Sequence, residues 1–278
     1  MQFENTVILT DLDGTLFNSK GLVSQEDRTA IADYIRLGGL FGIATGREPH
    51  NARLHLPQLP MNAPSIVLNG AAVYDFLKEQ YLSTVLLDKA AALQVLNHCC
   101  SLHLPLDIQI YTTEGIFYAS PLEEADPGFL RIHQPTSYLP MEKLERKDWI
   151  KVVLLEREKD ALCNMVDFLG ESGCGEKLSL VEGTTDVVKI GKYQELLPAG
   201  INKGVGIALV RSLPEYKGRT ILAVGDYWND MELLQAADLA CAPDNAIEEV
   251  KAVCRFILPS HNESPMAALI QNIIPSMA

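Results

Sequence analysis

The chain has 278 residues, 47% of them hydrophobic and 21% charged, which is enough for about two domains of an ordinary globular protein. Its formal net charge is −13 and no basic patch is evident, so we expect neither a nucleic acid nor an anionic membrane as partner. An anionic substrate would therefore need a local cation, either a metal ion or the side chain of a lysine or arginine.

Strands and helices alternate in the first part of the chain. The predicted elements are a strand at 6–10, a helix at 25–37, and strands at 40–44 and 66–68. Val7, Ile8 and Leu9 form a continuous apolar run, which is typical of a central parallel strand buried on both faces. Ser24 fits the N-cap of the helix. This alternation predicts a parallel, doubly wound sheet.

The pattern changes after residue 81. The predicted elements are a helix at 88–102, strands at 106–111, 115–119 and 149–155, a helix at 159–169, and strands at 178–182 and 186–190. A helix followed by two strands occurs twice in this stretch. That repeated order predicts an antiparallel α+β unit with its helices on one face.

The doubly wound pattern resumes near the end of the chain. The predicted elements are helices at 203–212 and 230–237, and strands at 220–224, 239–242 and 256–258. The chain thus leaves a sheet domain, builds a lid and returns. We predict an α/β fold in which residues 1–81 and 193–278 form the core and residues 82–192 form the inserted lid.

We expect a cytoplasmic protein, because the sequence shows no targeting signal and its cysteines are typical of reduced thiols. No basic-then-apolar signal peptide is found, and no apolar run approaches the roughly 20 residues of a membrane span. The six cysteines include no Cys-x-x-Cys pair, which is typical of reduced, buried thiols.

Two carboxylates, Asp11 and Asp13, follow the first strand directly, at the end where open α/β sheets bind ligands. Residues two apart in an extended segment face the same side, so these carboxylates need a cation or a shared proton to relieve their repulsion. Gly14 lets the backbone turn tightly beside a ligand. An ordinary turn is the alternative, whereas a calcium loop is disfavoured because Thr15 and Leu22 occupy two of its ligand positions.

Three further segments lie at predicted strand ends or helix starts. Thr45-Gly46-Arg47 offers a hydroxyl and backbone N–H groups to a phosphate oxygen, or forms an ordinary strand-to-helix turn. Lys203 opens a helix and neutralises a phosphate there, or is an isolated surface lysine. Asp226 follows a buried strand and suits Mg²⁺, while Asn229 or Asp230 also fits a helix N-cap.

In this order, the four segments resemble the haloacid dehalogenase superfamily, and more closely its Cof-type sugar-phosphatase-like hydrolases. The resemblance spans essentially the whole chain, including Asp11-Leu12-Asp13-Gly14-Thr15, Asn69-Gly70 and the run from Gly225 to Asp230. It implies a Rossmann-like core with an inserted α+β cap domain. It also implies a Mg²⁺-dependent phosphomonoester hydrolase that acts on a small phosphorylated metabolite such as a sugar phosphate.

The resemblance further implies a role for each residue. Asp11 would attack phosphorus to form an aspartyl phosphate, and Asp13 would act as general acid and then general base. Mg²⁺ would be held by Asp11, the backbone carbonyl of Asp13, and Asp226. Asn229 and Asp230 would support the metal indirectly. The residues implied at the phosphoryl oxygens are Leu12, Gly14, Thr45, Gly46 and Lys203, of which Thr45 and Lys203 would also stabilise charge in the transition state.

Several residues keep two interpretations. Arg47 contacts the substrate or forms a surface ion pair, and Asn69 orients the nucleophile or caps a turn. Tyr227-Trp228 replace residues that are often small or polar in the family, and either pack under the lid or contact the substrate. Residues 241–246 and 262–266 depart from the family's usual glycine-bearing runs, which bears on substrate contacts and not on the catalytic residues.

Two other functions stay open. A phosphomutase would use the same fold but keep the aspartyl phosphate and exclude water from it. A non-catalytic metabolite-binding protein is the other, because a fold does not dictate function. A phosphatase specialised for one phosphorylated disaccharide or glycerate is a narrower form of the preferred interpretation. Release of free phosphate distinguishes the hydrolase from the other two.

Overall fold

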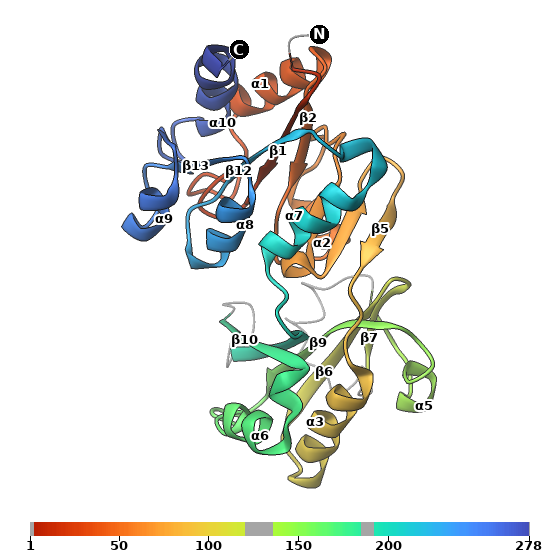
Figure 1. Cartoon of the computed structure of the whole chain (residues 1–278). Helices are drawn as coiled ribbons and strands as arrows, with labels where there is room; N and C mark the ends of the chain where they lie inside the picture. Colours follow the sequence, from red (N-terminus) through yellow and green to blue (C-terminus); the bar gives the residue numbers. More distant parts are fainter. Residues whose placement is uncertain (1–2, 120–135, 185–191, 278) are drawn as a thin grey trace. The chain divides into compact units, whose positions relative to one another are not determined.

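The computed structural model describes residues 3–119, 136–184 and 192–277, and the chain divides into two compact units (Figure 1). The first unit comprises Met1–Ser83 and Asn202–Ala278, and the second comprises Thr84–Ile201. No helix within the described ranges is long and apolar enough to cross a membrane.

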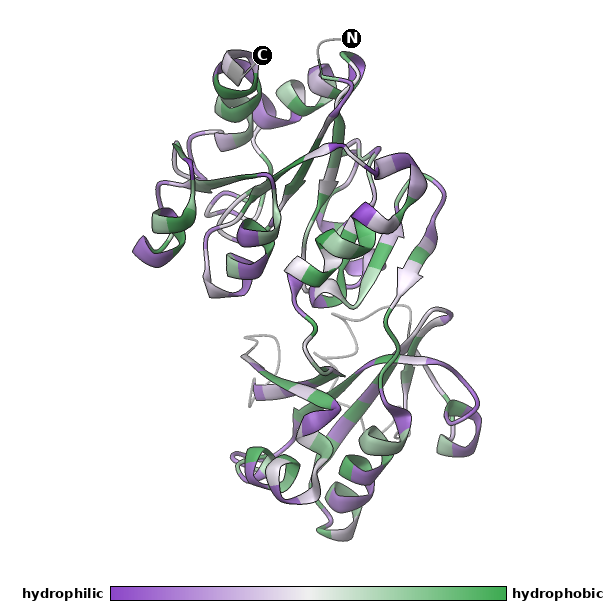
Figure 2. Cartoon of the chain, in the orientation of Figure 1, coloured by the Kyte–Doolittle hydropathy of each residue, from purple (hydrophilic) through white to green (hydrophobic). Residues whose placement is uncertain are grey.

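A parallel sheet of five strands forms the centre of the first unit, in the order β14-β13-β12-β1-β2. The strands are β1 (Thr6–Thr10), β2 (Leu40–Ile43), β12 (Thr220–Val224), β13 (Leu239–Pro243) and β14 (Phe256–Leu258). Val7, Ile8 and Leu9 of the central strand β1 are fully buried, and Figure 2 shows the sheet strands as largely hydrophobic. The predicted doubly wound parallel sheet is confirmed.

A small second sheet continues from the edge of β2. It contains β3 (Ser65–Val67), β4 (Ala72–Asp75) and β5 (Gln80–Thr84), and the 3₁₀ turn η1 (Leu68–Gly70) lies between β3 and β4. β3 pairs with β4 in the antiparallel sense, and an isolated parallel bridge joins Ala44 to Ile66. The end of β2 therefore lies beside β3.

The helices of the first unit form two groups around the parallel sheet. They are α1 (Gln25–Arg36), α2 (Pro49–His55), α7 (Lys203–Ser212), η4 (Pro214–Tyr216), η5 (Trp228–Asp230), α8 (Met231–Ala236), α9 (Glu248–Val253), α10 (Pro265–Ala268), η6 (Leu269–Ile273) and η7 (Ile274–Met277). Val7 and Leu9 pack with Ile207 of α7 and Leu233 of α8 in one buried cluster. Side chains alternate along a strand, so Ile8 points to the other face, and α1 packs against β2 and α10.

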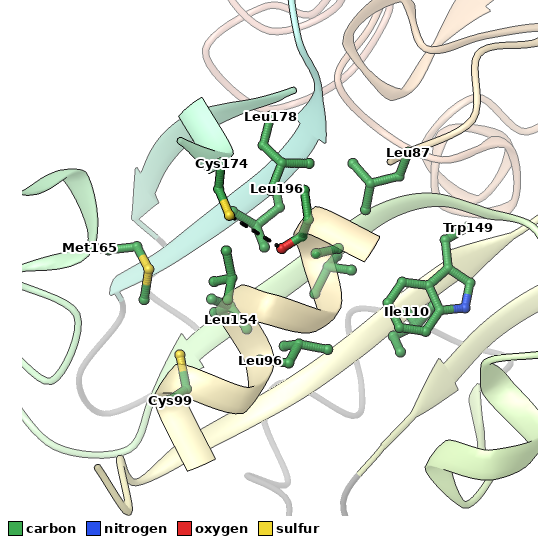
Figure 3. Close-up of a cluster of buried hydrophobic side chains, with 14 of the residues drawn as sticks. Leu87, Leu96, Cys99, Ile110, Trp149, Leu154, Met165, Cys174, Leu178 and Leu196 are labelled. Carbon is green, nitrogen blue, oxygen red and sulfur yellow. Dashed lines mark hydrogen bonds between the residues drawn. The ribbon is translucent and has the colours of Figure 1, made fainter. Parts of the chain in front are cut away.

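The second unit is a six-stranded sheet in the order β10-β11-β9-β6-β7-β8, antiparallel except for the parallel pair β7 and β8. Its elements are α3 (Lys89–Ser101), β6 (Leu106–Thr112), β7 (Gly115–Tyr118), β8 (Thr136–Tyr138), α5 (Met141–Leu144), β9 (Trp149–Glu156), α6 (Met165–Ser172), η3 (Cys174–Glu176), β10 (Leu178–Thr184) and β11 (Lys192–Pro198). Figure 3 shows Leu96 and Cys99 of α3 beside Leu154 of β9, within the buried cluster that holds this unit together.

Several elements of the second unit differ from the prediction: α6 begins later than predicted, and β8, α5 and β11 lie where no element was predicted. The helix predicted at 159–169 begins only at Met165, because the Glu156 carboxylate accepts hydrogen bonds from the N–H groups of Asp160 and Leu162 and holds the intervening chain in turns. The strand predicted at 186–190 lies outside the described residues. β10 pairs with β11, for which no strand was predicted. The return to the first unit therefore comes after β11, later than the predicted boundary at 192/193.

Candidate active site

Asp11, Thr45 and Asp226 follow three strands of the first unit that end at one edge of the parallel sheet. β1 pairs with both β2 and β12, so the carboxyl ends of the three strands lie together. The Asp11 N–H donates to the Val224 carbonyl at 2.8 Å, and the Ala44 N–H donates to the Thr10 carbonyl at 2.8 Å. These bonds extend the pairing of the strands by one residue and fix the backbone from which the Asp11 and Thr45 side chains project.

Lys203 joins Asp11 to Asp230 from the first turn of α7. Asn202 caps this helix by accepting a hydrogen bond from the Val205 N–H. Lys203 is 1% exposed, and its Nζ lies 2.6 Å from Asp11 Oδ1 and 2.5 Å from Asp230 Oδ1. Lys203 is therefore a buried cation between two carboxylates, and its interpretation as an isolated surface lysine is excluded.

Asp226 faces the loop that follows β1. The Thr15 hydroxyl donates to Asp226 Oδ1 at 2.8 Å. Gly14 has a φ of 82°, and a Cβ atom placed on it would lie 2.4 Å from Asp226 Oδ2, so only glycine allows this approach. Asp230 Oδ2 accepts from the Asp226 N–H at 3.0 Å, which sets the direction of the Asp226 backbone.

Asp11, Asp226 and Asp230 form an acidic cluster in which one carboxylate oxygen from each lies within 4.8 Å of the others. Among the described side chains, Lys203 is the ammonium group paired with this cluster, so negative charge is in excess there. An oxygen-only donor set with excess negative charge fits a hard divalent cation. The structure therefore supports a divalent cation at this position.

Burial and the neighbouring charges move the pKa values of the cluster. Burial raises the pKa of Asp11 to about 7, although the neighbouring Lys203 opposes this effect. Burial likewise raises the pKa of Asp226, against the hydrogen bond from Thr15. Burial alone would lower the pKa of Lys203, but the carboxylates of Asp11 and Asp230 outweigh it and raise that pKa, so the lysine stays charged.

The turn at Thr45 and Gly46 is braced by η1. Thr45 is 2% exposed, and its carbonyl accepts a hydrogen bond from the Asn69 N–H at 3.1 Å. A Cβ atom placed on Gly46 would lie 2.7 Å from Asn69 Oδ1, so the Asn69 amide packs directly on this glycine. Gly70 packs in the same way against the Asn202 carbonyl. The second segment therefore lies next to the start of α7, as expected for one shared site.

Asp13 lies outside the acidic cluster and pairs with Arg47. Arg47 Nη2 lies 3.0 Å from Asp13 Oδ1, and its Nε lies 3.2 Å from Asp13 Oδ2. Leu12 lies in a turn, and Asp13 forms an isolated parallel bridge with Phe17. The two carboxylates therefore pair with different cations, Lys203 and Arg47, and Arg47 takes the ion-pair interpretation. The Asp13 side chain is 65% exposed, which leaves it room to move.

The remaining predicted residues lie around this centre. The Leu12 side chain is buried, and its carbonyl accepts from the N–H groups of Thr15 and Phe17. Asn229 is exposed, as are Tyr227 and Trp228, which are 55% and 52% exposed. The exposure of the two aromatic side chains excludes them from the core of the first unit.

Sequence reasoning missed the residues that hold Arg47. Asn51 Oδ1 accepts from Arg47 Nη1 at 2.9 Å, and His55 Nδ1 lies 3.2 Å from the same atom. Asn51 and His55 are four residues apart on one face of α2, and Arg47 lies just before its N-cap, Glu48. That spacing was the available signal, but the helix implied after the Thr45-Gly46-Arg47 turn was given no residue range.

Comparisons with known proteins agree with this geometry. The family model of the haloacid dehalogenase-like hydrolases matches residues 8–270. The chain is 24% identical to a 5-amino-6-(5-phospho-D-ribitylamino)uracil phosphatase of Bacillus subtilis, over 96% of this chain and 97% of that protein. It is 24% identical to a phosphoglycolate phosphatase of Methanopyrus kandleri, over 97% of each chain. The crystal structure of TM0651 from Thermotoga maritima superimposes with a TM-score of 0.77 at 20% identity, covering 96% of this chain and 97% of that one.

The matched range contains all four segments on which the resemblance rested, from Asp11 to Asp230. The structural superposition covers both units, so the fold of the whole chain is shared with a solved structure. The two sequence relatives are both named as phosphatases. The chain therefore belongs to the haloacid dehalogenase-like hydrolases, as an enzyme of the phosphatase type.

Proposed function

We propose that this protein is a Mg²⁺-dependent phosphomonoester hydrolase that forms an aspartyl phosphate on Asp11. The observation that carries the proposal is the acidic cluster of Asp11, Asp226 and Asp230 around the buried ammonium of Lys203, at the carboxyl ends of β1 and β12. Such a cluster binds a divalent cation and presents a fixed carboxylate to the anion that the cation attracts.

Asp11 is the nucleophile in this proposal. Lys203 holds Asp11 Oδ1 at 2.6 Å, which fixes the orientation of a side chain that is 10% exposed. Attack on phosphorus forms the bond from the Asp11 oxygen and breaks the bond to the ester oxygen, so one difficult displacement becomes two easier steps. A Mg²⁺ ion held by Asp11, the Asp13 carbonyl and Asp226 would supply positive charge that offsets the repulsion between carboxylate and phosphate.

Asp13 moves the protons in both steps. It gives a proton to the departing ester oxygen and then takes one from the water that attacks the aspartyl phosphate. The Arg47 guanidinium contacts both oxygens of Asp13, so the side chain must leave Arg47 before either oxygen reaches a substrate. We infer that Arg47 holds Asp13 in a waiting position from which it turns.

Several groups would bind the phosphoryl oxygens. Thr45 offers its hydroxyl and Gly46 its backbone N–H, and the backbone of Leu12 and Gly14 closes the other side. Lys203 adds the positive charge that stabilises the transition state. Asn229 and Asp230 support the metal indirectly in this scheme; Asp230 does so through its bonds to Lys203 and to the Asp226 N–H.

The two units take different tasks in the proposal. We assign Met1–Ser83 and Asn202–Ala278 to the catalytic core and Thr84–Ile201 to a cap that selects the substrate. The named substrates of the two relatives are small phosphomonoesters of polar metabolites. We propose a substrate of the same class, with a sugar phosphate or a phosphorylated sugar alcohol as the first candidates.

The test is phosphate release from a panel of phosphorylated metabolites, with Mg²⁺ and with EDTA. We expect EDTA-sensitive release concentrated on a few compounds. Transfer of phosphate between positions of a sugar without release would point to a phosphomutase. Binding without any turnover by folded protein in Mg²⁺ would point to a metabolite-binding protein, and either result would overturn the proposal.

A further inference from the structure

Two segments that depart from the family pattern, residues 241–246 and 262–266, meet beside the loop that follows β1. Asn245 Nδ2 donates to the Gly14 carbonyl at 2.8 Å, and Asn245 Oδ1 accepts from the His261 N–H at 2.8 Å. One side chain therefore joins three segments of the first unit that are far apart in the sequence.

The loop between β13 and α9, which carries Asn245, also contacts the segment that carries Asp226. The Ile247 N–H donates to the Asp226 carbonyl at 3.1 Å, two residues after Asn245. The loop between β13 and α9 thus binds the backbone beside Asp13 through Gly14 and the backbone of Asp226 directly. Each contact uses a main-chain carbonyl, so it constrains the loop itself and not only a side chain.

The loop after β1 and the loop after β12 lie so close together at Gly14 and Asp226 that neither can shift without moving the other. A Cβ atom placed on Gly14 would lie 2.4 Å from Asp226 Oδ2, and the adjacent Thr15 hydroxyl donates to Asp226 Oδ1 at 2.8 Å. A small displacement of Gly14 would change where the Asp13 carbonyl and the Asp226 carboxylate stand relative to each other. Both groups are ligands in the proposed cation site.

The other end of the loop after β1, at Ser19, is held by Asn262, the residue that follows His261. Asn262 Oδ1 accepts from the Ser19 N–H at 2.9 Å and from the Ser19 hydroxyl at 3.0 Å. The His261 ring nitrogen Nε2 lies 3.2 Å from the same hydroxyl. Residues 14 to 19 are thus held at both ends by side chains of the two departing segments, and Asn245 is the contact next to the acidic cluster.

We propose that Asn245 is a positioning residue of the cation site, which sets the distance between the Asp13 carbonyl and the Asp226 carboxylate by holding Gly14. This inference rests on the proposed function, because it takes these groups as ligands of Mg²⁺. Residues that orient metal ligands contribute about 10- to 100-fold to metal affinity. Asn245 acts through the backbone and contacts no reacting atom.

The experiment compares Asn245→Ala with Asn62→Ala in the full chain. Asn62 makes a matched pair of hydrogen bonds, accepting from the Phe41 N–H at 2.8 Å and donating to the Gly39 carbonyl at 3.0 Å, but beside the start of β2 and not its end. Mg²⁺ affinity is measured by titration calorimetry without substrate, and thermal melting without metal reports folding. Asn245 is exposed, so its truncation opens no cavity.

We expect Asn245→Ala to bind Mg²⁺ about tenfold more weakly, with turnover recovering as Mg²⁺ is raised. Asn62→Ala should melt earlier yet bind Mg²⁺ like the unchanged protein. Equal affinity in Asn245→Ala and the unchanged protein would overturn the inference and leave the proposed function standing. An unchanged protein that binds no Mg²⁺ would overturn both.

A second variant guards against misfolding. Asn245→Ser keeps a small polar side chain but is too short to reach both Gly14 and His261, so it should also weaken Mg²⁺ binding. If neither variant folds, Asn245 is required for the fold itself and the positioning role is wrong.

Discussion

Each unit of this protein buries a lysine, and the two lysines differ in the charge around them. Lys151, 3% exposed in the middle of β9, pairs with Glu195 of the neighbouring β11 at 2.7 Å. Lys203, 1% exposed at the start of α7, pairs with both Asp11 and Asp230. Asp226 completes the acidic cluster around Lys203.

The difference separates a structural ion pair from a reactive site. Lys151 and Glu195 bring opposite unit charges together within a sheet, an arrangement that is neutral as a pair. The cluster at Lys203 has more carboxylates than ammonium groups, and burial prevents water from offsetting the excess. An uncompensated buried charge is costly unless a proton or a cation neutralises it, so the imbalance favours cation binding at this position.

The largest expected effect comes from Asp11→Asn. The change removes the proposed nucleophile, so turnover should fall by roughly 10⁴-fold or more. It also removes one of the excess carboxylates, so the metal-free protein should melt no earlier than the unchanged one. Phosphate release and thermal melting measure the two effects. Substantial turnover by a normally folded Asp11→Asn protein would show that Asp11 is not the nucleophile.

Removing each buried lysine tests the comparison itself. Lys151→Met removes the ammonium group beside the buried Glu195 carboxylate, which should lower the free energy of unfolding by about 3–5 kcal/mol. Adding Glu195→Met should restore most of that loss. Lys203→Met should cost at least as much, but adding Asp230→Asn should restore only part of it, because Asp11 and Asp226 remain. Urea unfolding without metal measures all four proteins, and equal rescue in both units would contradict the account.

The pKa of Asp11, about 7, predicts how Mg²⁺ binding depends on pH. Mg²⁺ binds the ionised carboxylate, so below pH of about 7 each binding event must release a proton, and affinity should fall roughly tenfold per pH unit. Above that pH it should be flat. Metal-free protein should lose stability as pH rises from about 4 to about 7, because Asp11 ionises more readily in the unfolded chain. Calorimetry showing equal affinity on both sides of pH 7 would contradict this.

The smallest effect is expected from Arg47→Ala. The ion pair with Asp13 is partly exposed, so its loss should change the free energy of unfolding by less than about 1 kcal/mol. Without Arg47 the Asp13 side chain breaks no ion pair before it turns, so kcat should rise by up to about fivefold with little change in KM. Arg36→Ala, which removes the exposed pair with Asp33, is the control and should leave kcat unchanged. Equal kcat in both variants would remove Arg47 from the mechanism.

The meeting of the four segments could be predicted because each signal is local. An apolar run ended by a polar side chain marks the carboxyl end of a buried strand, as at Asp11, Thr45 and Asp226. Parallel strands place those ends at one edge. Fold class and the neighbourhood of the site follow from these two facts, and the structure agrees with both.

The pairings inside the site could not be predicted in the same way. Asp230 fits a helix cap or indirect metal support by sequence, whereas the structure also shows it bound to Lys203, 27 residues earlier. Arg47 reaches Asp13 across 34 residues through side-chain rotations that no periodicity records. Such contacts depend on the folded geometry and not on spacing.

The second unit shows the same limit in its strands. β11 was missed because Gln194 and Glu195 are polar in sequence, although both are buried in the folded sheet. Glu195 is buried with Lys151 as its partner, and a hydrophobic pattern cannot register a buried charge whose partner lies 44 residues away. β11 was therefore missed for the same reason that Glu195 can be buried: its charge is paired with Lys151 in the folded sheet.

The most direct test of the central claim is to trap the aspartyl phosphate. In Asp13→Ala, an aryl phosphate with a good leaving group needs no proton from Asp13, so the enzyme should phosphorylate itself and then stall. Acid quenching and peptide mass spectrometry should find one phosphoryl group on the peptide that contains Asp11, and none when Asp11→Asn is added. Leaving-group release by Asp13→Ala without any phosphorylated Asp11 peptide would contradict the account.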